Sequence, residues 1–267
     1  MEITIGVIFF WLGAVLGSFA GAAVWRIRKK KDFVRGRSEC EHCHHQLSPL
    51  DLVPIFSWLF LRGRCRYCKK PIGWSALLAE LLLGLAFALS YLAWPLGFTS
   101  VLPGVLFGLW LAALVLLAIL YIYDLRWTLL PDRLVFPLIM ISALFFVGRM
   151  VLAGLPPLGW LLEGLYGLMP ITGLYGLLYF ASHGKWIGFG DVKLGIAIGL
   201  LLGWQQALLA LVLANFIGLL FVLPGLISRK LDRESQVPFG PFLILGTVIA
   251  FLYGHPLIEA YVNFLFP

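Results

Sequence analysis

The chain has 267 residues, of which 61% are hydrophobic and only 12% are charged, and its mean hydropathy is +0.96. A soluble domain is about 45–50% apolar and about 25% charged, so this composition excludes a water-soluble, disordered or collagen-like chain. The formal net charge is +7, which has to be compared with membrane topology before it is attributed to a nucleic-acid partner. We expect an all-α polytopic membrane protein, because a membrane-spanning helix needs about 20 apolar residues and several such runs fit this length.

Uninterrupted apolar runs predict eight membrane-spanning helices. They lie near residues 3–25, 76–96, 102–123, 134–153, 158–181, 192–204, 206–227 and 239–264. Residues 194–227 are the ambiguous part, because one helix of this length would measure about 51 Å, well beyond a hydrocarbon core of roughly 30 Å. A polar break at residues 203–206 (GWQQ) favours two short helices joined by a tight turn.

Lysine and arginine are concentrated in the segments 26–75, 124–133, 182–193 and 228–238, which hold 19 of the 20 basic residues. Short cytoplasmic loops are enriched in these residues. Eight spans place all four segments on one side of the membrane, whereas seven would turn the last segment outward. We therefore expect both termini outside the cytoplasm, and Arg149 is the single departure. The charge is thus a topology signal, and it predicts no nucleic-acid partner.

The beginning of the chain is predicted to stay in the membrane. It lacks a basic n-region, and its apolar run of about 22 residues is longer than the h-region of a cleaved signal peptide. The chain is thus divided into a first helix (1–25), a polar cytoplasmic domain (26–75) and a membrane domain with seven more helices (76–267).

The polar domain contains every cysteine of the chain, in two CxxC pairs separated by 21 residues: Cys40 with Cys43, and Cys65 with Cys68. Each pair can present two thiolates to one ion, and the two pairs together complete a tetrahedron. A segment of about 50 residues has little apolar core, so a bound metal would supply much of its folding energy. The pattern predicts a structural Zn²⁺ site.

Other uses of the cysteines remain open. Two disulfides would suit an oxidising compartment, which the predicted cytoplasmic position disfavours, and a redox-active pair or inert thiols are further alternatives. His42, His44 and His45 lie between the pairs and could compete as ligands, although we expect them at the surface.

Two acidic residues stand out by their position at the membrane boundary. Asp124 closes the third apolar run, and Asp191 opens the sixth from the same side. A carboxylate beside the bilayer is costly and indicates function. Two facing carboxylates can share one proton, so that the ionised group takes a proton from water while the neutral one polarises a peptide carbonyl. Gly188 and Gly190 would leave room for a substrate backbone.

These acids also have structural alternatives. Asp124 could pair with Arg126, and Asp191 could cap the following helix or pair with Lys193. Glu80, near the start of the second span, could pair with a basic residue of the polar domain or contribute to a second site. A proton-relay transporter and a non-catalytic zinc scaffold are the other functional classes. A transporter is disfavoured because we find no repeat and the acids do not lie at the bilayer midplane.

Several motifs together resemble one known family. Residues 16–19 (LGSF), 36–43 (GRSECEHC), 51–58 (DLVPIFSW), 61–68 (LRGRCRYC), 188–194 (GFGDVKL) and 238–241 (PFGP), with Asp124 and the pair Pro131-Asp132, occur in order over nearly the whole chain. This pattern is similar to the bacterial type IV prepilin leader peptidases, membrane aspartic proteases with a GxGD motif. Residues 73–80 depart from the family's commoner tyrosine–proline form but keep Glu80.

The resemblance implies a function and its partners. Asp124 and Asp191 would be the catalytic pair of an endopeptidase that removes the basic leader of type IV prepilins and type II secretion pseudopilins at the cytoplasmic face of the bacterial inner membrane. Family members with the cysteine domain commonly also N-methylate the new amino terminus with S-adenosylmethionine. Glu80 is a candidate for methyl transfer or for a structural role. No Rossmann-type glycine-rich loop is present, so a cofactor pocket would be unconventional. The oligomeric state and the particular pilin substrate do not follow from the sequence.

Overall fold

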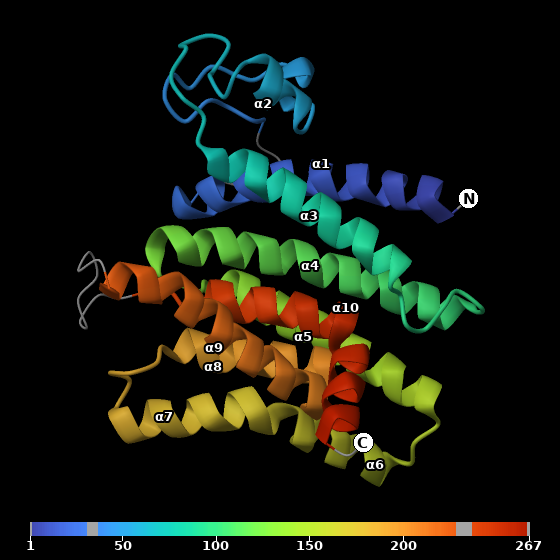
Figure 1. Ribbon diagram of the computed structural model, residues 1–267. Helices are drawn as coiled ribbons and strands as arrows, with labels where there is room; N and C mark the ends of the chain where they lie inside the picture. Colours follow the sequence, from blue (N-terminus) through green and yellow to red (C-terminus); the bar gives the residue numbers. More distant parts are fainter. Residues whose placement is uncertain (1, 31–36, 228–236, 266–267) are drawn as a thin grey trace. The chain divides into compact units, whose positions relative to one another are not determined.

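The computed structural model describes residues 2–30, 37–227 and 237–265 (Figure 1). Within these ranges the secondary structure is helical, and the only extended pairing is two isolated β-bridges. The long elements are α1 (Glu2–Arg28), α3 (Trp74–Leu92), α4 (Val101–Trp127), α5 (Asp132–Ala153), α6 (Pro157–Leu168), η2 (Met169–Gly173), α7 (Leu174–Ser182), α8 (Phe189–Leu202), α9 (Trp204–Ile227) and α10 (Gly240–Leu265), and the 26–75 domain adds η1 (Pro49–Leu52) and α2 (Phe56–Phe60).

The predicted spans coincide with these helices, and the chain is an all-α polytopic membrane protein. Seven helices of the described ranges are long and apolar enough to cross a bilayer, and α6, η2 and α7 together make one of them. The eighth predicted span is α8, which has only 14 residues. The ambiguous run 194–227 is two helices, as the polar break indicated. Gly203 joins them with φ +73°, a left-handed conformation that favours glycine.

The short α8 explains the one basic residue outside the four basic segments. Fourteen residues span about 21 Å, which is less than the hydrocarbon core of roughly 30 Å, so α8 is too short to cross the core by itself. Near its end Arg149 of α5 donates from Nη1 to the carbonyl oxygen of Leu201 at 3.1 Å. A cation at a helix C-terminus satisfies carbonyls that have no helical partner. The basic residues of 228–236 lie outside the described residues.

The chain divides into two compact units, residues 1–93 with 114–122, and residues 94–113 with 123–267. In the first unit α1 packs antiparallel to α3 through glycines. A methyl group on Gly13 would lie 2.6 Å from the carbonyl oxygen of Leu83, and one on Gly17 would lie 2.8 Å from Cα of Glu80. Such close backbone approach is the usual basis of helix association in membranes, where lipid removes the hydrophobic driving force.

The second unit is arranged around α8. A methyl group on Gly199 of α8 would lie 2.4 Å from the carbonyl oxygen of Gly167 in α6, and one on Gly195 would lie 2.8 Å from Ile171 in η2. Pro170 has no N–H to donate, and the chain there forms a single π-turn, a common way for a helix to accommodate such a residue. The contacts of Gly195 and Gly199 hold α8 against η2 and α6. They therefore fix the position of the first turn of α8, which contains Asp191.

Candidate active site and metal centre

Asp124 and Asp191 lie in the same unit and come together from different helices. Asp124 is in the last turn of α4 and is only 5% exposed, whereas Asp191 is in the first turn of α8 and is half-buried. The two carboxylates are close enough to interact electrostatically. The fold thus brings both predicted acids into one site, although 67 positions separate them in the sequence.

The carboxylate of Asp191 is held at the start of α8 by a backbone hydrogen bond to Gly188. Gly188 is the N-cap residue of this helix, so the contact is the half of a capping box in which an acid at the third position reaches back to the N-cap amide. The capping role considered from the sequence is therefore compatible with a site role, because it orients the carboxylate. Gly188 is exposed, while a methyl group on Gly190 would lie 3.1 Å from Cβ of Leu130. Gly190 thus has a packing role, and substrate approach at these glycines stays a prediction.

Asp124 is held by a residue that the sequence reasoning did not select for the site. Gly240, the first residue of α10, forms a backbone hydrogen bond to the Asp124 carboxylate. A methyl group on Gly240 would lie 2.5 Å from Oδ2 of Asp124, so only glycine allows this approach. The signal was present in the PFGP motif of residues 238–241, but its proximity to Asp124 depends on how α10 packs.

Two aromatic residues border the acids. Tyr175 of α7 is 5% exposed and lies within electrostatic range of Asp191. Its ring meets that of Phe239 edge to face, with centroids 5.9 Å apart. Phe239 directly precedes Gly240, so this contact joins α7 to the segment that holds Asp124. Helices α4, α7, α8 and α10 therefore all contribute to the site.

Lys193 makes a different contact from the one considered in the sequence. It forms an ion pair with Asp132, the first residue of α5, and not with Asp191. Its ammonium also lies 5.3 Å from the ring centroid of Phe189 and 5.7 Å from that of Phe136. These contacts join the first turns of α5 and α8.

The four cysteines form one cluster in the described part of the chain. Their sulfur atoms all lie within 4.8 Å of one another, and Sγ of Cys40 is 3.8 Å from Sγ of Cys68. A tetrahedral ion with Zn–S bonds of ~2.3 Å separates its sulfurs by about 3.8 Å, so the residues fit a metal. Burial alone would raise the pKa of the Cys40 thiol, but hydrogen bonds from the backbone of Cys43 and His42 and from the neighbouring thiols lower it to about 7. The backbone hydrogen bond from Lys70 would lower the pKa of Cys68, but burial and the neighbouring thiols raise it to about 11. A thiolate is the form that binds metal.

The two CxxC turns have the same backbone geometry. The amide of Cys40 donates to the carbonyl of His45, and the amide of Cys65 donates to the carbonyl of Lys70, at 3.0 and 2.9 Å. The residue after each second cysteine has a positive φ, 56° at His44 and 58° at Lys69. This repeated turn points both cysteines of a pair to the same side. The sulfur cluster contains no histidine, so the predicted surface positions of the three histidines agree with it.

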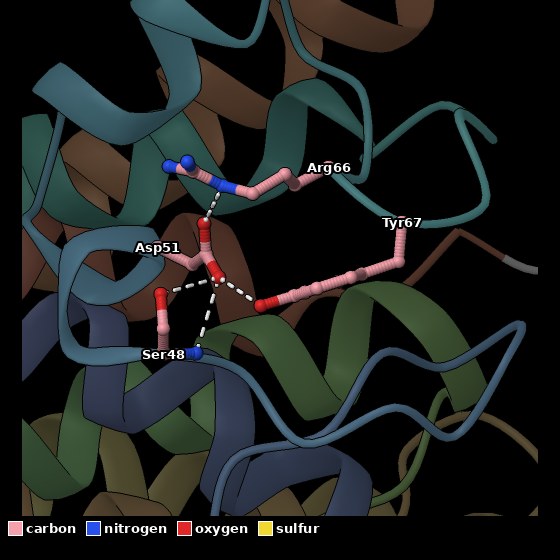
Figure 2. A network of polar contacts seen from close by, with 4 residues as sticks. All are labelled: Ser48, Asp51, Arg66 and Tyr67. Atoms are coloured by element: carbon pink, nitrogen blue, oxygen red, sulfur yellow. Dashed lines mark hydrogen bonds and ion pairs between the residues drawn. The ribbon is translucent and has the colours of Figure 1, made fainter.

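Asp51 organises the second turn from outside the sulfur cluster (Figure 2). Its side chain is 3% exposed, and Oδ1 accepts from Nε of Arg66 at 2.6 Å. Oδ2 accepts from the amide and the hydroxyl of Ser48, at 3.1 and 2.8 Å, and from the hydroxyl of Tyr67 at 3.2 Å. Arg66 and Tyr67 are the two residues between Cys65 and Cys68. One carboxylate therefore joins η1 to the second cysteine turn.

Glu80 contacts the polar domain, but its partner there is a backbone group. Its Oε2 accepts the amide of Ile55 at 2.7 Å, and the carboxylate is also hydrogen-bonded to the side chain of Ser18. Glu80 is buried. The structural role considered for this residue thus has a specific geometry, whereas a role in methyl transfer stays a prediction.

Comparisons with known proteins cover nearly the whole chain. Residues 11–94 match the bacterial peptidase A24 N-terminal domain, and residues 111–223 match the type IV leader peptidase family. An Aeromonas hydrophila protein named prepilin leader peptidase/N-methyltransferase is 35% identical over 86% of this chain and 76% of its own length. Proteins of the same name from Bacillus subtilis and Pseudomonas aeruginosa are 30% and 29% identical over 96% and 95% of this chain, and over 97% and 92% of their own lengths. No solved structure matches the chain significantly.

Proposed function

The chain belongs to the type IV leader peptidase family, and on this basis we propose that it is a membrane aspartic endopeptidase that cleaves the leaders of type IV prepilins and pseudopilins and then N-methylates the new amino terminus. The observation that supports the peptidase assignment is that Asp124 of α4 and Asp191 of α8 lie within electrostatic range of each other. A pair of carboxylates at a membrane boundary has the composition that aspartic peptide hydrolysis requires.

In the proposed reaction one carboxylate is ionised and the other is protonated. The ionised group takes a proton from water, and the water oxygen attacks the scissile carbonyl, while the protonated group donates to the carbonyl oxygen. Collapse of the tetrahedral intermediate breaks the C–N bond and returns a proton to the leaving amine. The backbone contacts from Gly188 to Asp191 and from Gly240 to Asp124 support this role, because preorganised carboxylates need less rearrangement in the transition state.

We further propose that this site faces the cytoplasm. The acids adjoin the basic segments 124–133 and 182–193, and the cysteine domain follows the basic end of α1. Since positive residues mark cytoplasmic loops, the site and the cysteine domain would lie on the side where the basic leader of a prepilin remains.

The metal of the cysteine cluster is proposed to be Zn²⁺. Four thiolates are a typical structural zinc set, and such a site has no open position for catalysis. Its contribution would be the folding energy of the 26–75 domain. Elemental analysis of purified protein should find one equivalent of zinc. Absence of zinc, together with a domain that keeps its fold in a chelator, would refute the assignment.

The methyl group would come from S-adenosylmethionine. Its sulfonium would supply an electrophilic methyl group to the new amine, which would lose a proton while the sulfur leaves as a thioether. The support is the name shared by relatives that cover most of this chain. Mass spectrometry of a matured pilin should show one added methylene unit at the amino terminus, and an unmodified terminus with cofactor supplied would argue against this activity.

The peptidase proposal is tested by incubating a candidate prepilin with purified wild type and with Asp124→Asn and Asp191→Asn. Each change removes a general acid or base and should lower the cleavage rate by about 10²–10⁴-fold. The fold should be retained, because asparagine has the same shape as aspartate. Glu259→Gln is the matched control, since Glu259 is 64% exposed in α10 and lies outside the site. Normal cleavage by either Asp variant would remove the assignment.

A further inference from the structure

The polar domain contains a stretch that the metal centre does not explain. Ten consecutive residues, 52–61 (LVPIFSWLFL), carry no charge, between Asp51 and Arg62. They include the end of η1, a short connection and α2, and we refer to them as the α2 loop. The loop belongs to a segment that is hydrophilic on average, but Ser57 is its only hydroxyl-bearing side chain.

Two contacts fix how far the α2 loop reaches along α1 and α3. The ring of Phe56 stacks on Trp11 of α1, with centroids 5.3 Å apart and planes 16° from parallel. The amide of Ile55 donates to Glu80 of α3, whose Cα lies beside Gly17 of α1. Figure 1 shows α2 alongside these two helices rather than beyond their ends.

These contacts lie well inside the apolar run of α1. The exposed basic residues from Arg28 to Lys30 mark one end of α1. At the rise of an α-helix, Gly17 is about 16 Å and Trp11 about 26 Å from Arg28 along the axis. Because the hydrocarbon core is roughly 30 Å thick, a loop that reaches Trp11 lies beside the apolar part of the span and not in the aqueous phase.

Much of the backbone of the α2 loop is hydrogen-bonded within the protein, as a bilayer requires. In hydrocarbon an unpaired N–H is costly, so irregular backbone must find partners within the protein. Pro54 has no N–H, and Ile55, which has a φ of +65°, donates to Glu80. The amides of the following loop residues 56, 57, 59 and 61 donate to carbonyls of the same loop, at 2.6–3.0 Å. Glu80 thus supplies an acceptor to the loop from a membrane helix.

The outer surface of the α2 loop is apolar. Phe60 is 84% exposed and Leu59 is 54% exposed. Toward the polar side Trp58 packs on Trp74, the first residue of α3, with centroids 4.6 Å apart, and Arg62 follows the loop. This is the order of residue types expected across a membrane interface. Basic residues lie in the aqueous phase, tryptophans lie at the boundary, and aliphatic or phenyl groups lie in the hydrocarbon core.

We propose that the α2 loop is embedded in the bilayer beside α1 and α3, with Leu59 and Phe60 in contact with lipid acyl chains. The cysteine domain would then be held against the membrane by this loop as well as by its two connections to α1 and α3. This proposal does not depend on proteolysis or on the identity of the metal.

The test uses full-length protein in nanodiscs of phosphatidylethanolamine and phosphatidylglycerol. The photoreactive amino acid p-benzoyl-phenylalanine replaces Phe60, and in a second protein it replaces Lys70, an exposed residue of the second cysteine turn. After irradiation, mass spectrometry should find lipid adducts at position 60 at several times the yield at position 70. Equal yields, or crosslinking of position 60 to another part of the chain or to an added prepilin in place of lipid, would overturn the proposal.

Glu80 offers an independent arm of the experiment. In the protein with the photoreactive residue at position 60, Glu80→Gln keeps an acceptor for the Ile55 amide and should preserve the lipid adducts. Glu80→Leu removes the acceptor and should reduce the adduct yield several-fold. The Ile55 amide would then have no partner in the hydrocarbon, which disfavours the embedded position of the loop. Adduct yields that stay the same in Glu80→Leu would show that Glu80 does not hold the loop in the bilayer.

Discussion

Gly240→Ala is a sharp test of how Asp124 is positioned. The added methyl carbon would lie 2.5 Å from Oδ2 of Asp124, whereas ordinary van der Waals separation begins near 3.5 Å. One of the two groups must therefore move by about 1 Å. The backbone of Gly240 is fixed at the start of α10, so the carboxylate is the group expected to rotate away, and it would lose the backbone hydrogen bond from Gly240.

The expected effect falls mainly on the rate. A displacement of about 1 Å in a catalytic group can cost on the order of 10²-fold, which corresponds to about 2.7 kcal/mol of activation free energy. Gly240 has no positive φ, so alanine can adopt the same backbone conformation without strain. We expect kcat/KM for prepilin cleavage to fall about 10²-fold with Tm close to that of wild type.

Gly108→Ala is the control, because it lies in the same helix as Asp124 and a methyl group there meets no atom within 4 Å. Both variants are compared with wild type by a gel-based cleavage assay in detergent and by thermal unfolding. If Gly240→Ala cleaves prepilin at the wild-type rate, the apposition of Gly240 and Asp124 does not position the carboxylate. A loss of the same size in Gly108→Ala would also refute the reasoning.

Other predictions concern the metal domain and the helix contacts. Asp51→Asn should weaken metal affinity by about 10–100-fold, as measured by competition with a chromophoric chelator. Unchanged affinity would show that Asp51 does not support the metal-binding turn of Cys65 and Cys68. Burial would raise the pKa of Asp51, but hydrogen bonds from Ser48 and Arg66 lower it, so the ionised group stabilises the domain above its unfolded pKa of ~3.9. The stability difference between wild type and Asp51→Asn should therefore disappear as the pH falls through the folded pKa, whereas a difference that persists in acid would contradict this. Lys193→Met should change the free energy of unfolding by less than about 1 kcal/mol, because its partner Asp132 is 57% exposed; a larger loss would give this ion pair a greater role. Gly13→Val should destabilise the α1–α3 pair by at least about 1–3 kcal/mol in thermal unfolding, whereas Gly21→Val, which meets no atom within 4 Å, should not.

Much of this molecule follows from local sequence, because the bilayer requires long apolar runs to form helices with internally paired backbone groups. The ends of α5 and α8 lie within three residues of the predicted ends, and the break at Gly203 was visible as a polar interruption. The scarcity of acids made Asp124 and Asp191 conspicuous, and the spacing of the cysteines predicted their cluster.

The partners of these residues were decided by tertiary packing. No local pattern shows that Gly240 approaches Asp124, that Lys193 pairs with Asp132, or that Arg149 reaches the end of α8. Each contact joins helices that are distant in sequence, and its geometry depends on how closely backbones approach at glycines.

The polar domain illustrates the same division. Its composition identified a four-cysteine segment, but the average over 50 residues concealed the uncharged stretch 52–61, and only the contacts of Phe56 with Trp11 and of Ile55 with Glu80 place that stretch beside membrane helices. Composition and periodicity therefore determined which segments are apolar, helical or able to bind metal. The tertiary structure decided which of them meet, since hydrogen bonds and close packing act over a few ångströms and join residues that the sequence leaves far apart.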